Sequence, residues 1–322
     1  MISSKEISIV VQGAVNTQTP ECLKSIREYL PDAEIILATY IGSDINGLDY
    51  DEVVLVEDPG FYLISDCPHS KKNNINRQIL TTFNGLKTAT RKYAFKLRSD
   101  FAMTGYGFLD YFDKFPKSDP DYKVFKHKIL SPVFFAYNPH KRHPFHPSDI
   151  AFFGLREDLL NLFDIPLMTK NESIAYKVDG YNCCQYAPEQ YILIKCLLKN
   201  GKDINCKHQR DVNDKNAIDS EKYIASNFIY LDWKQFSLNA PFHLKTLSYN
   251  NFGDVITHIE WQTLYKQHID TKHETPNRDD IRSRINLFKC YRVMTNIVAF
   301  LIPCKKIRKR VRRKILKNIV IS

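Results

Sequence analysis

The residues of this chain that are best suited to chemistry follow strand-like apolar runs, at the points where those runs end. Ligands of open α/β sheets bind at the carboxyl ends of the strands, because parallel strands end at the same edge. A guanidinium group matches a phosphate in a bidentate way, and a carboxylate can bind a divalent cation. We therefore expect these polar ends to converge on one crevice. They are Gln12-Gly13, Thr39, Asp58-Pro59-Gly60 and Arg98-Ser99-Asp100.

The elements that must position these residues alternate along the chain. Continuous apolar, β-branched runs are typical of buried strands in a parallel sheet, and apolar residues at helical spacing predict helices. The predicted strands are residues 7–11, 34–40, 51–60 and 93–100, and the predicted helices are residues 19–30, 73–90 and 188–201. This order predicts an α/β fold with a Rossmann-like sheet that is flanked by helices and becomes mixed after residue 100.

The net charge of +10 is concentrated near the C-terminus. Residues 281–322 contain 13 Lys and Arg and no acidic residue, whereas residues 1–280 contain 33 basic and 36 acidic residues. A protein that reads a nucleic-acid groove carries its basic residues on the folded face, so we expect no nucleic-acid partner. We predict one domain over residues 1–270, followed by a linker and a basic helical tail over residues 271–322.

The tail combines its positive charge with an apolar stripe. Ile307, Val311, Ile315 and Ile319 stand four residues apart and would form one face of a helix. This pattern favours an anionic membrane surface, with a solvated terminal helix or an RNA-attracting tail as alternatives. No apolar run is long enough to span a membrane, and no signal peptide is recognisable. We therefore expect a cytoplasmic protein, peripheral on the inner face of the cytoplasmic membrane.

Several motifs in the first half of the chain resemble one group of enzymes. They are Asn76-Arg77-Gln78, Gly85-Leu86, Lys92-Tyr93 and the run from Lys96 to Asp100. Together with the order of the surrounding elements, these motifs resemble the GT-A glycosyltransferases, and most closely the WavE family of lipopolysaccharide-synthesis proteins, over about residues 5–265. The resemblance implies a GT-A-like fold. It also implies a transferase that uses an activated nucleotide sugar to build a lipopolysaccharide, O-antigen or capsule polysaccharide.

The resemblance also implies donor-binding residues, with one departure. The usual Asp-x-Asp motif is here Arg98-Ser99-Asp100, so a single carboxylate, Asp100, remains to bind Mn²⁺ or Mg²⁺. Arg98 is the alternative source of positive charge for the leaving diphosphate. The expected donor-binding residues are Gln12, Gly13, Thr39, Asp58, Asn76, Arg77, Arg98 and Asp100.

An inverting transfer needs a base that takes the proton of the acceptor hydroxyl. Glu189, in the first turn of a predicted helix, resembles the acidic residue that does this in related enzymes, and Asp149 is the second candidate. Gln190 and the loop residues Lys141 and Arg142 are expected to contact a lipid-linked glycan or lipopolysaccharide-core acceptor.

Each of these residues also has an ordinary structural interpretation. Asp100 could cap a loop, Asp58 could form an Asx turn, and Glu189 could complement a helix dipole. Because one carboxylate of the motif is missing, the alternative function is an inactive scaffold protein of polysaccharide assembly that kept the fold.

Overall fold

The structure of the protein is a computed structural model. It describes residues 2–65, 71–178, 180–239, 254–275, 286, 290, 291, 293–297 and 299–312. Seven strands form one central sheet in the order β12-β8-β9-β6-β1-β2-β3. Their bounds are β1 (Ile7–Gln12), β2 (Glu34–Tyr40), β3 (Glu52–Val56), β6 (Tyr93–Arg98), β8 (Ile129–Pro132), β9 (Ala151–Leu155) and β12 (Phe228–Leu231).

The sheet is mixed, as the sequence predicted. Strands β3, β2, β1 and β6 run parallel to one another, and β12 runs parallel to β8. Strand β9 runs antiparallel to both of its neighbours, β6 and β8. The chain therefore forms a doubly covered α/β sheet with one reversed strand, which confirms the predicted fold class.

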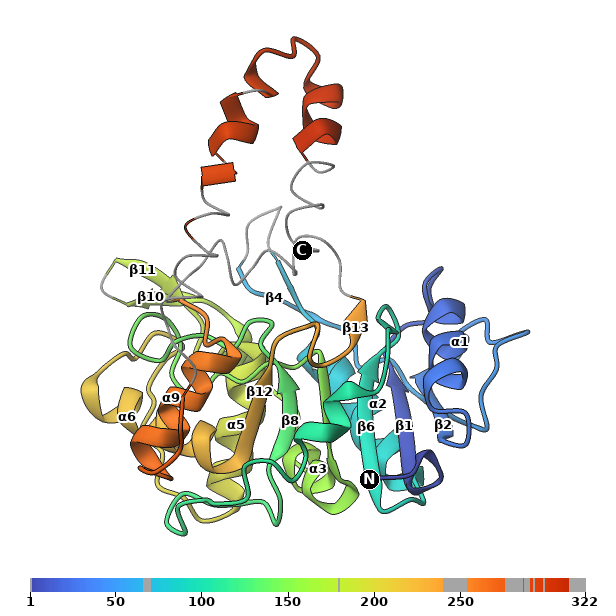
Figure 1. Ribbon diagram of the computed structural model, residues 1–322, viewed down its shortest axis with the longest axis horizontal. Helices are drawn as coiled ribbons and strands as arrows, with labels where there is room; N and C mark the ends of the chain where they lie inside the picture. Colours follow the sequence, from blue (N-terminus) through green and yellow to red (C-terminus); the bar gives the residue numbers. More distant parts are fainter. Residues whose placement is uncertain are drawn as a thin grey trace.

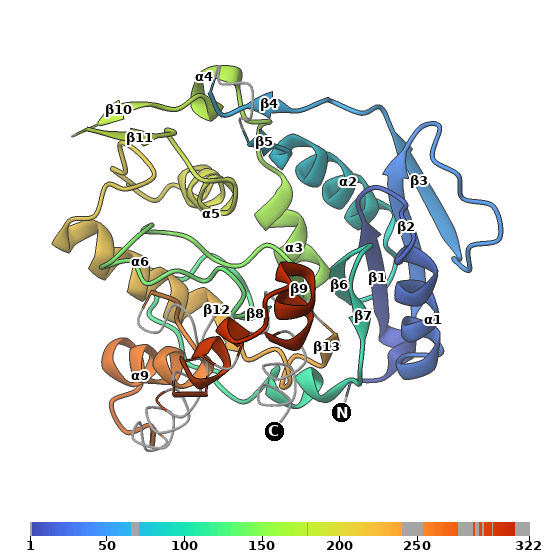
Figure 2. The same ribbon diagram turned by 90° about the horizontal axis from the view of Figure 1, so that it is seen from above.

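Helices cover both faces of the sheet (Figures 1 and 2). Helices α2, α3 and α5 lie on one face, and α1 and α9 lie on the other (Figure 2). The helices are α1 (Thr19–Tyr29), α2 (Ile75–Thr88), α3 (Arg156–Phe163), α4 (Lys170–Ser173), α5 (Pro188–Lys199), α6 (Asp214–Asn227) and α9 (His258–His268), with short 3₁₀ turns at Ser4–Glu6 and Gly107–Tyr111. Three two-stranded sheets pair β4 (Tyr62–Leu63) with β5 (Lys72–Asn73), β7 (Ala102–Met103) with β13 (Leu238–Asn239), and β10 (Tyr176–Val178) with β11 (Tyr181–Cys183).

Strand β1 lies inside the sheet, between β6 and β2, and all six of its residues are buried. Helix α2 packs against β1 and β2, and its Gly85 faces Val10 so closely that a Cβ atom on the glycine would overlap the valine side chain. This close approach fixes the position of α2, whose first turns reach the ends of the strands.

One of the predicted buried strands is not buried. Strand β3 is the last strand of the sheet, and Leu55 on it is 45% exposed. An edge strand has a partner on one side only, so an apolar β-branched run does not by itself indicate burial.

Only part of the predicted tail belongs to the described residues. Residues 305–312 are helical, and Phe300 and Leu301 are 75% and 78% exposed. Ile315 and Ile319 of the predicted apolar stripe lie outside the described residues. No helix in the described part of the chain is long and apolar enough to span a membrane. The division of the chain at residue 270 stays a prediction.

Candidate functional site

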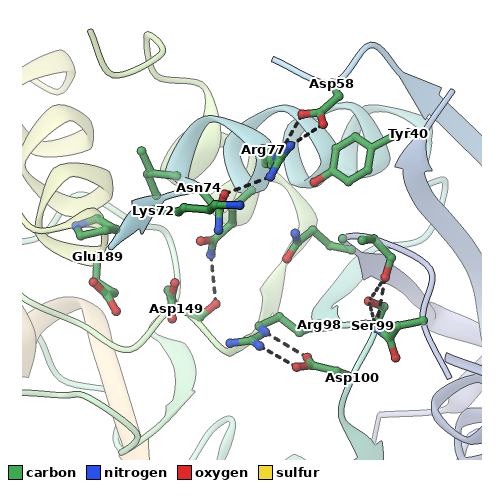
Figure 3. Close-up of a pocket in the computed structure, with 17 residues that line it drawn as sticks. Tyr40, Asp58, Lys72, Asn74, Arg77, Arg98, Ser99, Asp100, Asp149 and Glu189 are labelled. Atoms are coloured by element: carbon green, nitrogen blue, oxygen red, sulfur yellow. Dashed lines mark hydrogen bonds and ion pairs between the residues drawn. The ribbon is translucent and has the colours of Figure 1, made fainter. Parts of the chain in front are cut away.

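A polar cavity of about 560 Å³ lies at the carboxyl ends of β1, β2 and β6 (Figure 3). Its walls come from three strand ends, the first turns of α2 and α5, and the loop before β9. The lining residues are Gln12, Gly13, Ala14, Asn16, Tyr40, Asp58, Lys72, Asn74, Ile75, Arg77, Gln78, Arg98, Ser99, Asp100, Asp149, Pro188 and Glu189. The predicted residues at the ends of β1 and β6 and after β3 therefore line one crevice, and β2 contributes Tyr40 in place of the predicted Thr39.

The charged residues of the cavity form two groups of different chemistry, which we name as sides (Figure 3). We call Asp58, Arg77, Arg98 and Asp100 the arginine side. We call Asp149 and Glu189, together with His146 behind them, the carboxylate side.

The first ion pair of the arginine side joins α2 to the segment after β3. Arg77 donates from Nε to Oδ1 of Asp58 at 2.6 Å and from Nη1 to Oδ1 of Asn74 at 3.1 Å. Its guanidinium also lies over the rings of Tyr40 and Phe61, at 5.9 and 5.5 Å from the centroids. The hydrogen bonds from Arg77 hold the pKa of Asp58 below its usual range.

The second ion pair lies at the end of β6. Arg98 binds Asp100 through two bonds, Nε to Oδ1 at 3.0 Å and Nη2 to Oδ2 at 2.6 Å. Ser99 between them is buried and donates to the carbonyl oxygen of Ala14 at 2.8 Å, which fixes the turn.

The donor set for a metal ion at Asp100 is incomplete. Both oxygens of this carboxylate are bound by Arg98, and no group of three His, Cys, Asp or Glu side chains in the described residues is arranged to hold a metal ion. A divalent cation needs six or more oxygen ligands, so most of them would have to come from a bound phosphate and water. These residues alone do not fit a metal centre, and the predicted cation stays a prediction.

Gln12 and Gly13 form the floor of the cavity at the end of β1. Gly13 has φ of +119°, a left-handed conformation that favours glycine, and a Cβ atom there would lie 3.4 Å from Oγ of Ser99. Gln12 is buried, and its Oε1 has no hydrogen-bond partner among the described residues. A ligand group that donates a hydrogen bond can satisfy this oxygen.

The carboxylate side is built by α5 and the loop before β9. Glu189 follows Pro188 in the first turn of α5, and its Oε2 lies 3.3 Å from Nε2 of His146, whose side chain is 2% exposed. Burial raises the pKa of Glu189, but His146 beside it and a backbone hydrogen bond to the carboxylate act together to lower the pKa below its usual range. Burial and the negative charge of Glu189 raise the pKa of Asp149. The pKa values of the two carboxyl groups are thus shifted in opposite directions.

A buried lysine holds the backbone of the carboxylate side. Lys96 on β6 is fully buried and donates from Nζ to the carbonyl oxygen of Asp149 and, at 3.4 Å, to that of Ile150. Gln78 of α2 donates to the same oxygen of Asp149 at 3.1 Å. Burial lowers the pKa of Lys96 to about 7.

Two residues predicted to bind the donor do not line the cavity. Thr39 is buried in β2, and its Oγ1 lies 3.1 Å from Oγ of Ser43. Asn76 is buried on α2, where its amide exchanges hydrogen bonds with the backbone N–H and carbonyl of Met168 at 2.7 and 2.9 Å. Both side chains have internal partners that do not involve a ligand.

The three predicted acceptor residues also lie outside the cavity lining. Gln190 is buried and donates to the carbonyl oxygen of Pro144 at 2.7 Å. Lys141 is exposed, and the Arg142 guanidinium lies 4.4 Å from the centroid of the Tyr137 ring. Their contact with an acceptor stays a prediction.

Several polar residues that shape the site were not among the predicted site residues, including His146, Lys96 and Lys72. His146 was visible as a neighbour of Asp149 in the same loop, three residues before it. Lys96 stands in an apolar strand, which is an unusual place for a lysine and was therefore a usable signal.

A match to a family model shows which protein family this chain belongs to. The model of WavE lipopolysaccharide synthesis matches residues 7–292. The chain belongs to this family. The family predicted from the motifs is thereby confirmed, and its description assigns the family to lipopolysaccharide synthesis.

Solved structures give more distant similarities. The protein in the crystal structure of S. aureus TarS shares 12% sequence identity with this chain, and the two structures superpose with a TM-score of 0.35. The match covers 68% of this chain and 39% of the TarS chain. The crystal structure of S. aureus TarS 1-349 is 10% identical with a TM-score of 0.34, over 98% of this chain and 90% of that one. The WavE chain thus spans about two fifths of the first TarS chain. No curated protein matches it in sequence.

Proposed function

We propose that this WavE protein is an inverting glycosyltransferase. It moves a hexosyl or pentosyl group from a nucleotide sugar to a lipopolysaccharide, O-antigen or capsule acceptor. The observation that carries the proposal is the composition of the cavity, which is lined by two arginine–carboxylate pairs and by two further carboxyl groups, Asp149 and Glu189. Guanidinium groups match the donor diphosphate, and an ionised carboxylate can take a proton from the acceptor.

The reaction that fits this arrangement is a single displacement. The acceptor oxygen forms a bond to the anomeric carbon while the bond from that carbon to the diphosphate oxygen breaks. The nucleoside diphosphate leaves with the electron pair of that bond, and the proton of the acceptor hydroxyl passes to Glu189. Because attack and departure occur on opposite faces of the sugar, the product is inverted.

Arg77 and Arg98 supply positive charge to the leaving diphosphate. Each is already held by a carboxylate, Asp58 and Asp100, so its guanidinium is oriented before the donor binds. A bound Mn²⁺ or Mg²⁺ would add positive charge at Asp100. The test below therefore includes the metal as a separate variable.

We further propose that the basic tail brings the protein to an anionic membrane, at the cytoplasmic face where the lipid-linked acceptor lies. The described residues there combine exposed Phe300 and Leu301 with exposed Lys305, Lys306 and Arg310. Exposed apolar groups next to cations are typical of peptides that bind the membrane interface.

The second candidate function is an inactive scaffold protein of polysaccharide assembly. One observation favours it: Asp100, the remaining carboxylate of the motif, is already paired with Arg98. A scaffold would keep the cavity but release no nucleoside diphosphate.

The deciding experiment is a thermal-shift panel of UDP-, GDP-, ADP- and CMP-linked sugars on the full chain, each with Mn²⁺ or with EDTA. A ligand at a hundred times its Kd stabilises the folded protein by about 2.7 kcal/mol. Donors that bind are then tested for release of the nucleotide in the presence of lipopolysaccharide. Binding without release in any condition would favour the scaffold. A shift by no donor would reject the transferase.

The tail is tested by deleting residues 281–322 and measuring cosedimentation with vesicles. The full chain is expected to bind vesicles that contain anionic phosphatidylglycerol and not vesicles of phosphatidylcholine alone. The truncated chain is expected to lose this binding and to keep its donor-induced thermal shift. Equal cosedimentation of both chains would reject the role of the tail.

A further inference from the structure

A buried histidine touches one of the two carboxyl groups of the cavity and has no role in the function proposed above. Nε2 of His146 lies 3.3 Å from Oε2 of Glu189, and the His146 side chain is 2% exposed. The same short loop carries Asp149, the other carboxyl group, three residues later. One loop thus supplies both a partner for the first candidate base and the second candidate itself.

We propose that His146 is a positioning residue that decides which carboxyl group receives the acceptor proton. It contacts the carboxylate of Glu189 and orients it for the acceptor proton, whereas Asp149 has no ion-pair partner among the described residues. This inference rests on the proposed transferase function and refines it, because it assigns the base among two candidates that line the same cavity.

The ring of His146 is fixed by its neighbours. It lies 4.8 Å from the ring of Tyr137 and stacks on the ring of His143, with 5.3 Å between centroids. His143 is itself held through Nδ1 by the carbonyl oxygen of Gln209 at 2.6 Å. A ring packed in this way cannot turn away from Glu189 without disturbing two aromatic neighbours.

The two ring nitrogens of His146 have different surroundings. Its Nδ1 is buried and has no hydrogen-bond partner among the described residues. An N–H group at that position would be buried without an acceptor, which is costly. Nε2 is therefore the ring nitrogen with a polar partner, and an N–H group there that faces the carboxylate of Glu189 favours the ionised form of that group.

Three other titratable groups lie near Glu189: His143, Asp149 and Tyr137. Burial lowers the pKa of His143 to about 4, so this ring is uncharged at neutral pH. Burial and the negative charge of Glu189 raise the pKa of Asp149. The hydroxyl of Tyr137 stays protonated, because burial raises its pKa.

Two cations on β6 lie near Asp149 and reduce the rise in its pKa without reversing it. Lys96 and Arg98 both lower the pKa of Asp149, but burial and the charge of Glu189 dominate. Lys96 binds the backbone carbonyl of Asp149, and Arg98 binds the carboxylate of Asp100. Asp149 is therefore left without an ion-pair partner in the described residues, in contrast to Glu189.

The same loop contains a matched control. His140 lies 3.0 Å from Oε1 of Glu221, so it also forms a His–Glu pair, but neither residue lines the cavity. A substitution at His140 removes the same type of contact from the same loop. It leaves the carboxylate side intact, which separates general effects on the loop from effects on the base.

The test compares His146→Phe, His146→Gln and His140→Phe in the full chain. The assay is release of nucleoside diphosphate between pH 5 and 9, with the donor that gives the largest thermal shift. Phe keeps the ring but not the donor atom, and Gln keeps a donor. We expect kcat of His146→Phe to fall about tenfold or more, with the acidic limb of its pH profile moved to higher pH and with donor KM within about twofold. His146→Gln should have a kcat and an acidic limb between those of His146→Phe and the wild type. His140→Phe should have the kcat and the pH profile of the wild type.

The outcomes separate the inference from the proposed function. If the wild type releases no nucleotide with any donor, the transferase proposal fails. If the wild type is active and His146→Phe keeps its kcat and its acidic limb, the inference about His146 is wrong. A uniform loss of kcat at every pH, with no movement of the limb, would also overturn it, since this would be the result of a structural role only. Thermal unfolding of each variant checks that it is folded. If His146→Phe does not fold, His146→Gln is compared with the wild type in its place.

Discussion

The two sides of the cavity hold similar numbers of charged groups and treat them differently. On the arginine side, both cations pair with carboxylates in bidentate ion pairs whose side chains are 26 to 41% exposed. On the carboxylate side, two acids share a buried region with one histidine. Exposed ion pairs contribute ~1 kcal/mol or less, so a ligand phosphate can replace one partner at small cost. Buried charges instead determine which group carries a proton.

The difference indicates a division of tasks. The arginine side is suited to binding an anion that comes and goes, and the carboxylate side is suited to a proton transfer that needs a fixed protonation state. The following substitutions test this division, beginning with the one that should have the largest effect.

Glu189→Gln should separate catalysis from binding. The amide keeps the shape of the side chain but cannot accept the acceptor proton, so transfer should fall by about 10²- to 10⁴-fold. The Kd of the donor should change little, because the residues of the arginine side remain intact. Both quantities are measured on the same preparation, by nucleotide release and by isothermal titration calorimetry. Transfer at the rate of the wild type would remove Glu189 from the mechanism.

Arg98→Ala should have the opposite signature. A hydrogen bond to a charged group contributes ~1.5 to 3 kcal/mol, so donor Kd should rise by about 10- to 100-fold. Arg98→Lys keeps the charge without the bidentate geometry, so its donor Kd should lie between those of the wild type and Arg98→Ala. Addition of Mn²⁺ tests whether a freed Asp100 can then bind a cation. A donor Kd that does not change in either variant would show that the arginine side does not bind the diphosphate.

Lys96→Met should change the pH dependence of stability. The pKa of Lys96 is lowered from 10.5 to about 7 in the folded protein, so between these values the unfolded chain binds more protons than the folded one. The stability of the wild type, relative to Lys96→Met, should therefore rise as the pH increases from about 7 to 10.5, and should not change below this window. Urea unfolding at several pH values measures the difference. A difference that does not depend on pH would mean that Lys96 keeps its usual pKa.

Asp58→Asn should have the smallest effect. It removes a carboxylate that competes with the donor phosphate for Arg77, but it also removes the partner that orients the guanidinium. These two changes oppose each other, so donor Kd should stay within a few-fold of that of the wild type. Titration calorimetry checks this. A loss as large as that of Arg98→Ala would identify Asp58 as a direct ligand of the donor.

The strand-end residues could be predicted because one geometric rule applies to them. Parallel strands share an edge, so the residues after β1 and β6 must be neighbours however the rest of the chain folds. Gln12, Arg98 and Asp100 follow this rule. Thr39 shows its limit, because alternate residues of a strand point to opposite faces, and in β2 it is Tyr40 that reaches the cavity.

Polar residues on helices were harder to predict, because two structural outcomes have the same sequence pattern. Asn76 and Gln190 are polar residues in first turns, as Arg77 and Glu189 are. Their amides instead satisfy backbone groups of other segments, Met168 and Pro144. Those partners lie far away in sequence, so the local pattern holds no trace of them. For the same reason, the sequence did not predict the contact between His146 and Glu189. His146 lies in a loop that has no regular secondary structure.

The anomeric configuration of the newly formed glycosidic bond tests the account most directly. It is measured by proton NMR on the product made with the donor that the thermal-shift panel identifies. A base on the carboxylate side and a leaving diphosphate on the arginine side require attack from the opposite face, so the account predicts inversion. A product that retains the configuration of the donor would contradict it, because retention requires a step that Glu189 acting as a base does not provide.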